Sequence, residues 1–184
     1  ENGMEFISND LNEIDKMNIR PANIEDVKHI FEFVKIIAVK ETNNVISLPE
    51  EFSSTIADQE KWIRYYSENE NALLLVAESE GKIVGVLDFK THPKIRMSHS
   101  GEFGISILPE YQNQKIGSKM IEFLLQWTTT RPKIKKINLC VFHPNTRAIH
   151  VYKKLGFEIE GVQVGAVQIS QGEFIDLVMM ARVV

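Results

Sequence analysis

The sequence predicts an α/β domain, because strand-like and helix-like segments alternate along one chain of ordinary globular composition. The chain has 184 residues, about the length of one domain. Hydrophobic residues make up 43% of it and charged residues 25%, values that exclude disordered and fibrous classes. The spacing of the apolar residues predicts the element order βααβββαβαββ.

The N-terminal part of the domain predicts a strand followed by a helix. A short strand-like segment covers residues 17–20. Asn23 stands where a side chain can cap the free N–H groups of a helix start, and the two acidic residues after Ile24 suit the positive helix end. Apolar residues at helical spacing continue to Ala38, so we expect this helix to bury one face.

A polar loop, a second helical pattern and a hairpin signal follow. Residues 41–54 form the predicted loop, and Trp62 and Tyr66 belong to a shorter amphipathic helix. Two apolar segments, residues 72–78 and 82–89, are separated by a short turn that contains a glycine. This arrangement is typical of a β-hairpin.

The C-terminal half alternates strands with helices and ends with two strands. In chain order, we expect a strand over residues 101–108, a helix over about 117–128, a strand over 136–141, a helix over 145–155, and strands over 157–169 and 173–183.

Charge, cysteine content and hydropathy exclude several function classes. The formal net charge is −4, so we expect neither nucleic acid nor a membrane surface as a partner. The single cysteine, Cys140, excludes an internal disulfide and is expected to be a packed core thiol. Residues 1–16 are polar and acidic, unlike a signal peptide, and are predicted to be an N-terminal extension of a domain over residues 17–184. A cytoplasmic location follows as the expectation.

Two segments carry most of the chemical information. Residues 105–118 run from a strand through a polar turn into a helix start, where free N–H groups form an anion site suited to phosphates. Residues 145–157 place Asn145 at a helix cap and Gly156 at a left-handed C-terminal cap. About two helical turns separate Asn145 from Tyr152, so both can face one cleft.

Together these segments resemble the GNAT (Gcn5-related N-acetyltransferase) superfamily. The family's phosphate-loop pattern, Q/R-x-x-G-x-G/A, is similar to Gln112-Asn-Gln-Lys-Ile-Gly117, and its later pattern, N-x-x-A-x-x-x-Y-x-K-x-G-F, is matched from Asn145 through Phe157. The resemblance implies the GNAT fold, a central mixed, mostly antiparallel sheet of six to seven strands. About four helices flank that sheet, which is splayed at the acetyl-CoA site.

One position departs from the pattern, because Lys115 replaces the first glycine of the phosphate loop. A lysine costs little if its φ is negative, but its side chain crowds the turn. A contact between its ammonium and a phosphate is the alternative role.

The resemblance implies direct transfer of the acetyl group of acetyl-CoA to an amine, without a metal. Tyr152 matches the tyrosine that protonates the CoA thiolate, and Asn145 matches an asparagine near the pantetheine arm. Ile107 and Leu108 correspond to the strand whose backbone groups hydrogen-bond the pantetheine and polarise the acetyl carbonyl. The residues implied in pyrophosphate binding are Gln112, Asn113, Gln114, Lys115, Ile116, Gly117 and Ser118.

Glu102 is the predicted base that removes a proton from the amine. It lies ten residues before Gln112, where several small-amine acetyltransferases of this family carry a glutamate. A carboxylate on a mostly buried strand makes a stronger base than one in water. Asp88, His99 and water stay open as alternatives. His92 and His99 are also candidates to line the acceptor pocket.

The resemblance places the acceptor between residues 41–58 and 162–172. The first segment has no Lys or Arg, which favours a cationic amine; its acidic residues are Glu41, Glu50, Glu51 and Asp58. We therefore expect an N-acetyltransferase acting on a primary amine of a small molecule, such as an amino acid or a polyamine. A protein N-terminal or lysine acetyltransferase and a non-catalytic acyl-CoA-binding sensor remain as alternatives. The family also suggests a homodimer.

Overall fold

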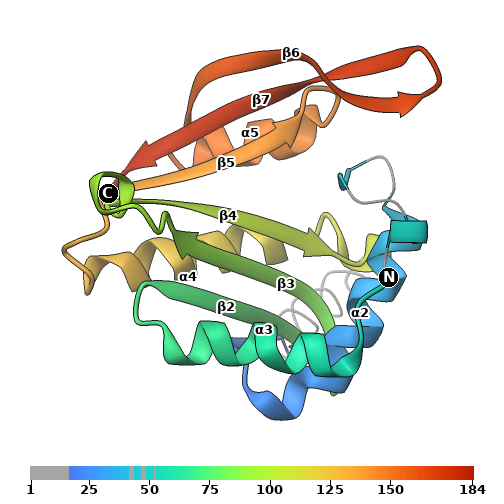
Figure 1. Cartoon of the computed structure of the whole chain (residues 1–184), viewed down its shortest axis with the longest axis vertical. Helices are drawn as coiled ribbons and strands as arrows, with labels where there is room; N and C mark the ends of the chain where they lie inside the picture. Colours follow the sequence, from blue (N-terminus) through green and yellow to red (C-terminus); the bar gives the residue numbers. More distant parts are fainter. Residues whose placement is uncertain (1–16, 42–43, 47–48, 52) are drawn as a thin grey trace, which may run out of the picture.

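Seven strands form one sheet in the order β1-β2-β3-β4-β5-β7-β6 in the computed structural model of the chain (Figure 1). The structure describes residues 17–184 except 42–43, 47–48 and 52, so the predicted extension over residues 1–16 lies outside it. The strands are β1 (Asn18–Pro21), β2 (Ala72–Ser79), β3 (Lys82–Thr91), β4 (Ser100–Ile107), β5 (Lys136–Phe142), β6 (Glu158–Ser170) and β7 (Glu173–Val183). The longer helices are α2 (Val27–Lys40), α3 (Ile56–Glu68), α4 (Ile116–Thr129) and α5 (Thr146–Lys154).

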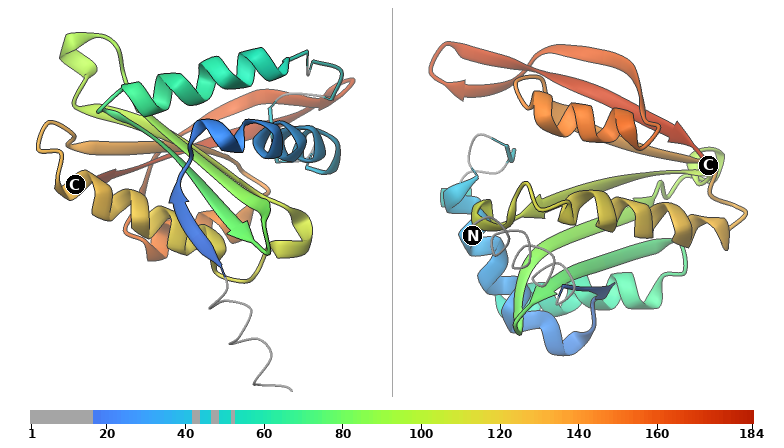
Figure 2. Two further views of the ribbon diagram at one scale, coloured as in Figure 1. Left: turned by 90° about the horizontal axis from the view of Figure 1, so that it is seen from below. Right: turned by 180° about the vertical axis from the view of Figure 1, so that it is seen from behind.

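The predicted element order and fold class are both confirmed. Neighbouring strands are antiparallel except β4 and β5, so the sheet is mixed and mostly antiparallel. Helices α2 and α3 cover one face, and α4 and α5 cover the other (Figure 2). No helix in the described part of the chain is long and apolar enough to cross a membrane.

Local signals in the sequence account for where the elements begin and end. Asn23 forms a capping box with Asp26 before α2, and Thr55 forms one with Asp58 at the start of α3. Gly156 takes a φ of +82° after α5, in agreement with the predicted left-handed cap. The hairpin turn between β2 and β3 has two consecutive residues with positive φ, which matches the twist of the strands it joins.

Alternation along β3 assigns each side chain to one face of the sheet. The Phe89 ring packs against Trp127 of α4, at a centroid distance of 5.9 Å. The next side chain, Asp88, accepts a hydrogen bond from Tyr66 of α3 on the opposite face. Odd-numbered residues of β3 therefore face α4, and even-numbered residues face α2 and α3.

Strands β4 and β5 begin side by side and then diverge (Figure 1). Their parallel pairing covers only Ser100–Glu102 against Lys136–Asn138. Beyond this point β4 is paired on one side only, through β3. The N–H of Leu108 donates to the Val84 carbonyl at 2.9 Å, so alternation turns the backbone groups of Phe103, Ile105 and Ile107 towards the gap.

A carboxylate–guanidinium cluster attaches β1 and the start of α2 to the sheet. The guanidinium of Arg20 donates to both carboxylate oxygens of Asp26 at 2.8 Å, and also contacts Glu78 of β2 at 2.9 Å. The Asp26 side chain is 7% exposed, whereas that of Glu78 is 30% exposed. The hydrogen bonds from Arg20 lower the pKa of Asp26 below its ordinary value.

Replacing Asp26 by Asn is expected to lower the free energy of unfolding at pH 7 by about 1.5–3 kcal/mol, because a charge-assisted pair is lost. Since the folded pKa is depressed, this contribution exists above the unfolded pKa of about 3.9 and disappears as the pH falls through the folded pKa. Denaturant titrations at pH 7 and pH 3 measure both effects. Glu78→Gln, at the more exposed partner, is the control and should cost less than about 1 kcal/mol. Equal losses in the two variants would contradict this account.

Candidate active site

The gap between β4 and β5 opens into a cavity of about 840 Å³. Its walls come from β3, β4 and β5, from the segment after α2, and from the starts of α4 and α5. Ten of the predicted site residues line it: Glu102, Ile107, Gln112, Asn113, Lys115, Ile116, Gly117, Ser118, Asn145 and Tyr152. Segments far apart in the sequence thus meet at one site.

The phosphate-loop segment is strained at Lys115. Its φ is +62°, so the condition under which a lysine costs little is not met. A left-handed residue is needed there because the chain turns from the extended backbone of Gln112 into the first turn of α4. Asn113 has a φ of +65°, so two of the three positive-φ residues other than glycine in the described chain lie in this loop. Strain of this kind is typical of functional sites.

The start of α4 faces the cavity through Ile116, Gly117 and Ser118. Lys115 at the N-cap makes no side-chain hydrogen bond to the helix start, so the first backbone N–H groups have no capping side chain. A Cβ on Gly117 would lie 3.3 Å from Cδ1 of Ile107, so a glycine here lets the helix start approach β4. The loop therefore has the donors and the dipole of an anion site.

Two predicted coenzyme contacts do not lie in the cavity. Leu108 is fully buried, its N–H donates to Val84, and its carbonyl accepts from the N–H of Tyr111 at 2.9 Å. The N–H of Leu108 is therefore paired with β3 and does not face the gap, which contradicts the prediction for this group. Gln114 points away and donates to the carbonyl of Glu110 at 3.2 Å. By contrast, the backbone of Ile107 faces the gap.

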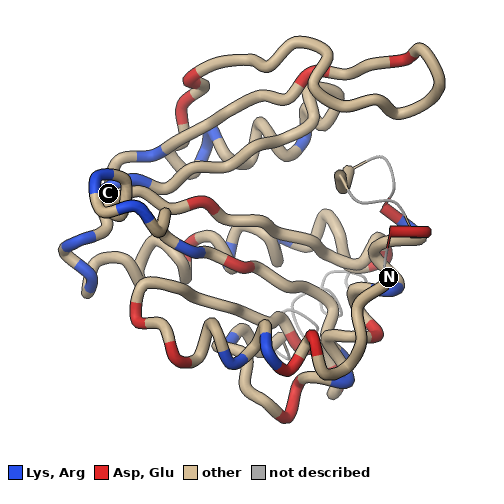
Figure 3. Tube along the Cα trace, in the orientation of Figure 1, with Lys and Arg blue, Asp and Glu red and all other residues tan. Residues whose placement is uncertain are grey.

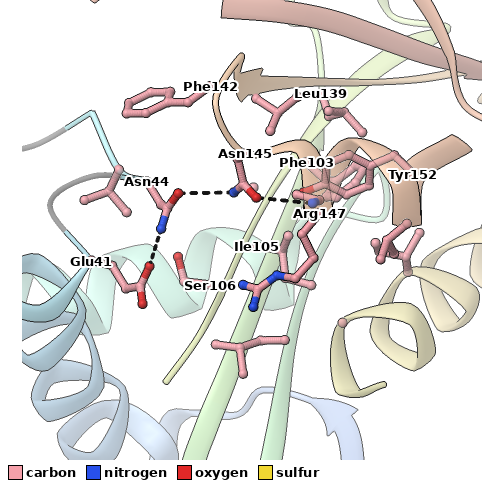
Figure 4. A pocket seen from close by; sticks show the side chains of 18 of the residues that line it. Glu41, Asn44, Phe103, Ile105, Ser106, Leu139, Phe142, Asn145, Arg147 and Tyr152 are labelled. Atoms are coloured by element: carbon pink, nitrogen blue, oxygen red, sulfur yellow. Dashed lines mark hydrogen bonds between the residues drawn. The ribbon is translucent and has the colours of Figure 1, made fainter. Parts of the chain in front are cut away.

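Glu41 connects residues on one side of the cavity mouth through both of its carboxylate oxygens. Figure 4 shows its bond to Asn44. Oε1 accepts from Gln112 at 2.9 Å, and Oε2 accepts from Asn44 at 2.7 Å. Asn44 in turn accepts from the side chain of Asn145 at 3.2 Å. The Asn145 oxygen caps α5 by accepting from the N–H of Ala148. Asn145 therefore combines the cap role with a position in the cavity wall.

Arg147 of α5 reaches across to the phosphate-loop segment. Its guanidinium donates to the side-chain oxygens of Gln112 at 2.6 Å and Asn113 at 3.0 Å. Sequence reasoning missed this residue because it occupies a variable position of the N-x-x-A pattern. It also missed Asn44, for which the polar loop gave no signal beyond composition.

Tyr152 lies on the α4 and α5 side of the sheet, where it is 9% exposed. Its ring packs edge-to-face against Phe103 and Phe157, with centroid distances of 6.0 and 6.2 Å. Burial raises the pKa of its hydroxyl to about 12, so the phenol keeps its proton at neutral pH. Tyr152 is thus suited to donate a proton into the cavity.

Two carboxylates line the cavity from the opposite face of the sheet. Asp88 is half-buried, and its Oδ2 accepts from the hydroxyl of Tyr66 at 3.0 Å. A Cβ at Gly104 would lie 3.1 Å from Oδ1 of Asp88, so the glycine leaves room beside this oxygen. Burial raises the pKa of Asp88, and the nearby Glu102 adds to the shift. Glu102 itself is exposed, whereas its predicted role as the base assumed a carboxylate on a mostly buried strand.

Several sequence expectations are wrong about what the cavity contains. His92 and His99, the candidates to line the acceptor pocket, do not line it. Of the acidic residues between 41 and 58, Glu41 is the one that lines it, and residues 162–172 contribute none of its walls. Among the described residues, no group of three or more His, Cys, Asp or Glu side chains could hold a metal ion.

Cys140 was expected in the core and instead is exposed to the cavity. Alternation along β5 buries Leu139 and Val141 and turns Cys140 to the other face, where the departing β4 no longer covers it. Desolvation and the charge of Glu102 raise the pKa of this thiol, so it remains protonated at neutral pH. A protonated thiol is a weak nucleophile.

Comparisons with known proteins agree with this geometry. Residues 39–157 match the acetyltransferase (GNAT) family. The chain is 36% identical to the L-amino acid N-acetyltransferase of Escherichia coli over 109 residues, 59% of this chain and 67% of that protein. It is 32% identical to the spermidine N(1)-acetyltransferase of E. coli over 47% of this chain and 45% of that one. A GNAT-family acetyltransferase structure from Streptococcus pneumoniae superimposes with a TM-score of 0.87 at 27% identity, covering 91% of this chain and 99% of that chain.

Replacing Lys115 by Gly is expected to raise the free energy of unfolding by about 0.5–1 kcal/mol, because glycine adopts a positive φ without a Cβ clash. Thermal and denaturant unfolding measure the change. Lys115→Ala is the matched control, since it removes the ammonium but keeps the Cβ, and it should give no stabilisation. If Lys115→Gly proves no more stable than Lys115→Ala, the strain assigned to this loop is incorrect.

Proposed function

Because the chain belongs to the acetyltransferase (GNAT) family, we propose that it transfers the acetyl group of acetyl-CoA directly to a primary amine of a small molecule. One observation carries this proposal. The cavity at the β4–β5 gap has a protonated phenol on one face of the sheet and two carboxylates on the other. An acyl transfer to an amine requires this pair of functions, an acid for the leaving thiolate and a base for the ammonium.

The cavity residues suit the anionic end of acetyl-CoA. We assign the pyrophosphate to the start of α4, where free backbone N–H groups are joined by the hydroxyl of Ser118 and the ammonium of Lys115. Arg147 adds a guanidinium that already lies against this loop. The pantetheine arm, which resembles a peptide in its amide groups, matches the unpaired backbone of β4 and the side chain of Asn145.

In the proposed reaction, the base and the acid act from opposite faces of the sheet. The amine approaches from the side of Asp88 and Glu102, one of which accepts a proton from its ammonium. The amine nitrogen forms a bond to the acetyl carbon, the carbon–sulfur bond breaks, and Tyr152 donates its proton to the departing sulfur. The nitrogen loses its second proton as the amide forms, and this proton restores the phenol of Tyr152. Unpaired N–H groups of β4 are positioned to stabilise negative charge on the acetyl oxygen. Holding both reactants in one cavity supplies much of the rate.

The function is tested by measuring release of the CoA thiol from acetyl-CoA with amino acids, polyamines and short peptides, against a blank without acceptor. We expect release with small amines, and Tyr152→Phe should lower kcat about 100-fold or more. The dissociation constant of acetyl-CoA should stay unchanged, because the ring and its packing remain. Tyr65→Phe, at an exposed tyrosine outside the cavity, is the matched control. Release with peptides alone favours a protein acetyltransferase, and tight binding without any release favours a sensor.

The base is identified by comparing Glu102→Gln with Asp88→Asn. We expect Glu102→Gln to lower kcat by about 100-fold while sparing acetyl-CoA binding. Unchanged turnover in Glu102→Gln together with a large loss in Asp88→Asn would move the role to Asp88. In that case the kcat/KM of Glu102→Gln would fall, on the acid side of its pH profile, at a pH above the ordinary pKa range of a carboxyl group. The shift is upward because a base must be unprotonated to act, and burial raises the pKa of Asp88.

A further inference from the structure

The acceptor side of the cavity contains a cation as well as its two carboxylates. Lys90 lines the cavity and lies directly opposite Glu102 in the register of β3 and β4. It is two residues from Asp88 on the same face of β3, about 7 Å along the strand. Charges of both signs are visible towards the end of β3 and the start of β4 in Figure 3.

The ammonium of Lys90 is available to a ligand. Although Glu102 is its cross-strand neighbour, Lys90 forms no ion pair within 4.0 Å in the part of the chain that the structure describes. Its charge still acts on Asp88, whose pKa it lowers against the larger effect of burial. The three charges thus lie close enough to act on one small molecule.

These charges discriminate between classes of acceptor. A polyamine offers only cations, and its second ammonium would meet Lys90. A third carboxylate, Glu41, does not change this, because both of its oxygens already accept hydrogen bonds from Gln112 and Asn44. An α-amino acid offers an amine for Asp88 or Glu102 and a carboxylate for Lys90. It is complementary to the site in both charges.

Farther along β5 from these charges, the cavity wall is apolar. Phe142 of β5 and Leu177 of β7 lie opposite each other in register, both are buried, and both line the cavity. Alternation puts Phe142 on the same face of β5 as Cys140, which is electrostatically coupled to Glu102. An apolar side chain that extends from the charged groups along β5 would therefore contact apolar surface.

We infer that the acceptor is an α-amino acid with an apolar side chain, and that Lys90 binds its carboxylate. This inference rests on the proposed acetyltransferase function and names its substrate class. Lys90 acts as a specificity-determining residue, whereas the carboxylates serve any amine. The acceptor is recognised through a carboxylate adjacent to the amine, a group that a simple amine or a polyamine lacks.

The test compares L-phenylalanine with phenethylamine, which lacks only the carboxylate, in wild type and in Lys90→Met. We expect wild type to prefer L-phenylalanine in kcat/KM. Lys90→Met should reduce kcat/KM for L-phenylalanine about 10–100-fold through loss of a charge-assisted contact, and that for phenethylamine less than about threefold. Lys94→Met is the control, since Lys94 is a nearby lysine outside the cavity, and it should change neither value.

Equal losses for both acceptors in Lys90→Met would overturn the assignment of Lys90. Turnover of spermidine or phenethylamine in preference to amino acids would overturn the substrate class while leaving the proposed acetyltransferase function intact. Release of CoA thiol no faster than the blank with every amine, by protein that binds acetyl-CoA, would overturn both.

Discussion

The early end of the pairing between β4 and β5 is the constraint on which the rest of the site depends. Only three residue pairs join these strands, and beyond Glu102 one edge of β4 has no strand beside it. A sheet interior does not leave backbone N–H and C=O groups unpaired without a compensating partner. The separation therefore creates both a cavity and a row of polar groups that a bound ligand can satisfy. It also makes the cavity accessible from both faces of the sheet at one point.

The hydrogen-bonded residues around the mouth compensate for this opening. Gln112 connects three elements, because its amide donates to Glu41 and to the Ile107 carbonyl while its oxygen accepts from Arg147. Side chains from the segment after α2, from the loop before α4 and from α5 are thereby held in one network. Such a network keeps the two diverging halves of the sheet in a fixed relation without closing the space between them. Preorganised polar groups of this kind cost little reorganisation when a ligand binds.

How much the sequence could predict depends on the range of the interactions involved. Helix caps such as Asn23 and Gly156 and the apolar periodicity are local, so the element order followed directly from them. The errors concern positions whose surroundings are set by the divergence of β4 and β5. Cys140 alternates like a core residue, and only the departure of β4 exposes it. Leu108 lies one residue past β4, where its N–H is already paired with β3. Arg147 gave no signal because its partners are 34 and 35 residues away.

The two ends of the cavity differ in charge, which the net charge of the chain does not reveal. The chain carries a formal charge of −4, yet the end of the cavity at α4 presents Lys115, Arg147 and a helix N-terminus. These groups favour an anion and are poorly suited to a cationic acceptor. At the other end, two carboxylates outnumber Lys90, so an ammonium is favoured there. Under the proposed function, the anionic end of the coenzyme and the ammonium of the acceptor are thus directed to opposite ends of the cavity. Because Tyr152 stays protonated while Asp88 and Glu102 lie across the sheet, the proposed proton donor and the proposed base are on separate faces as well.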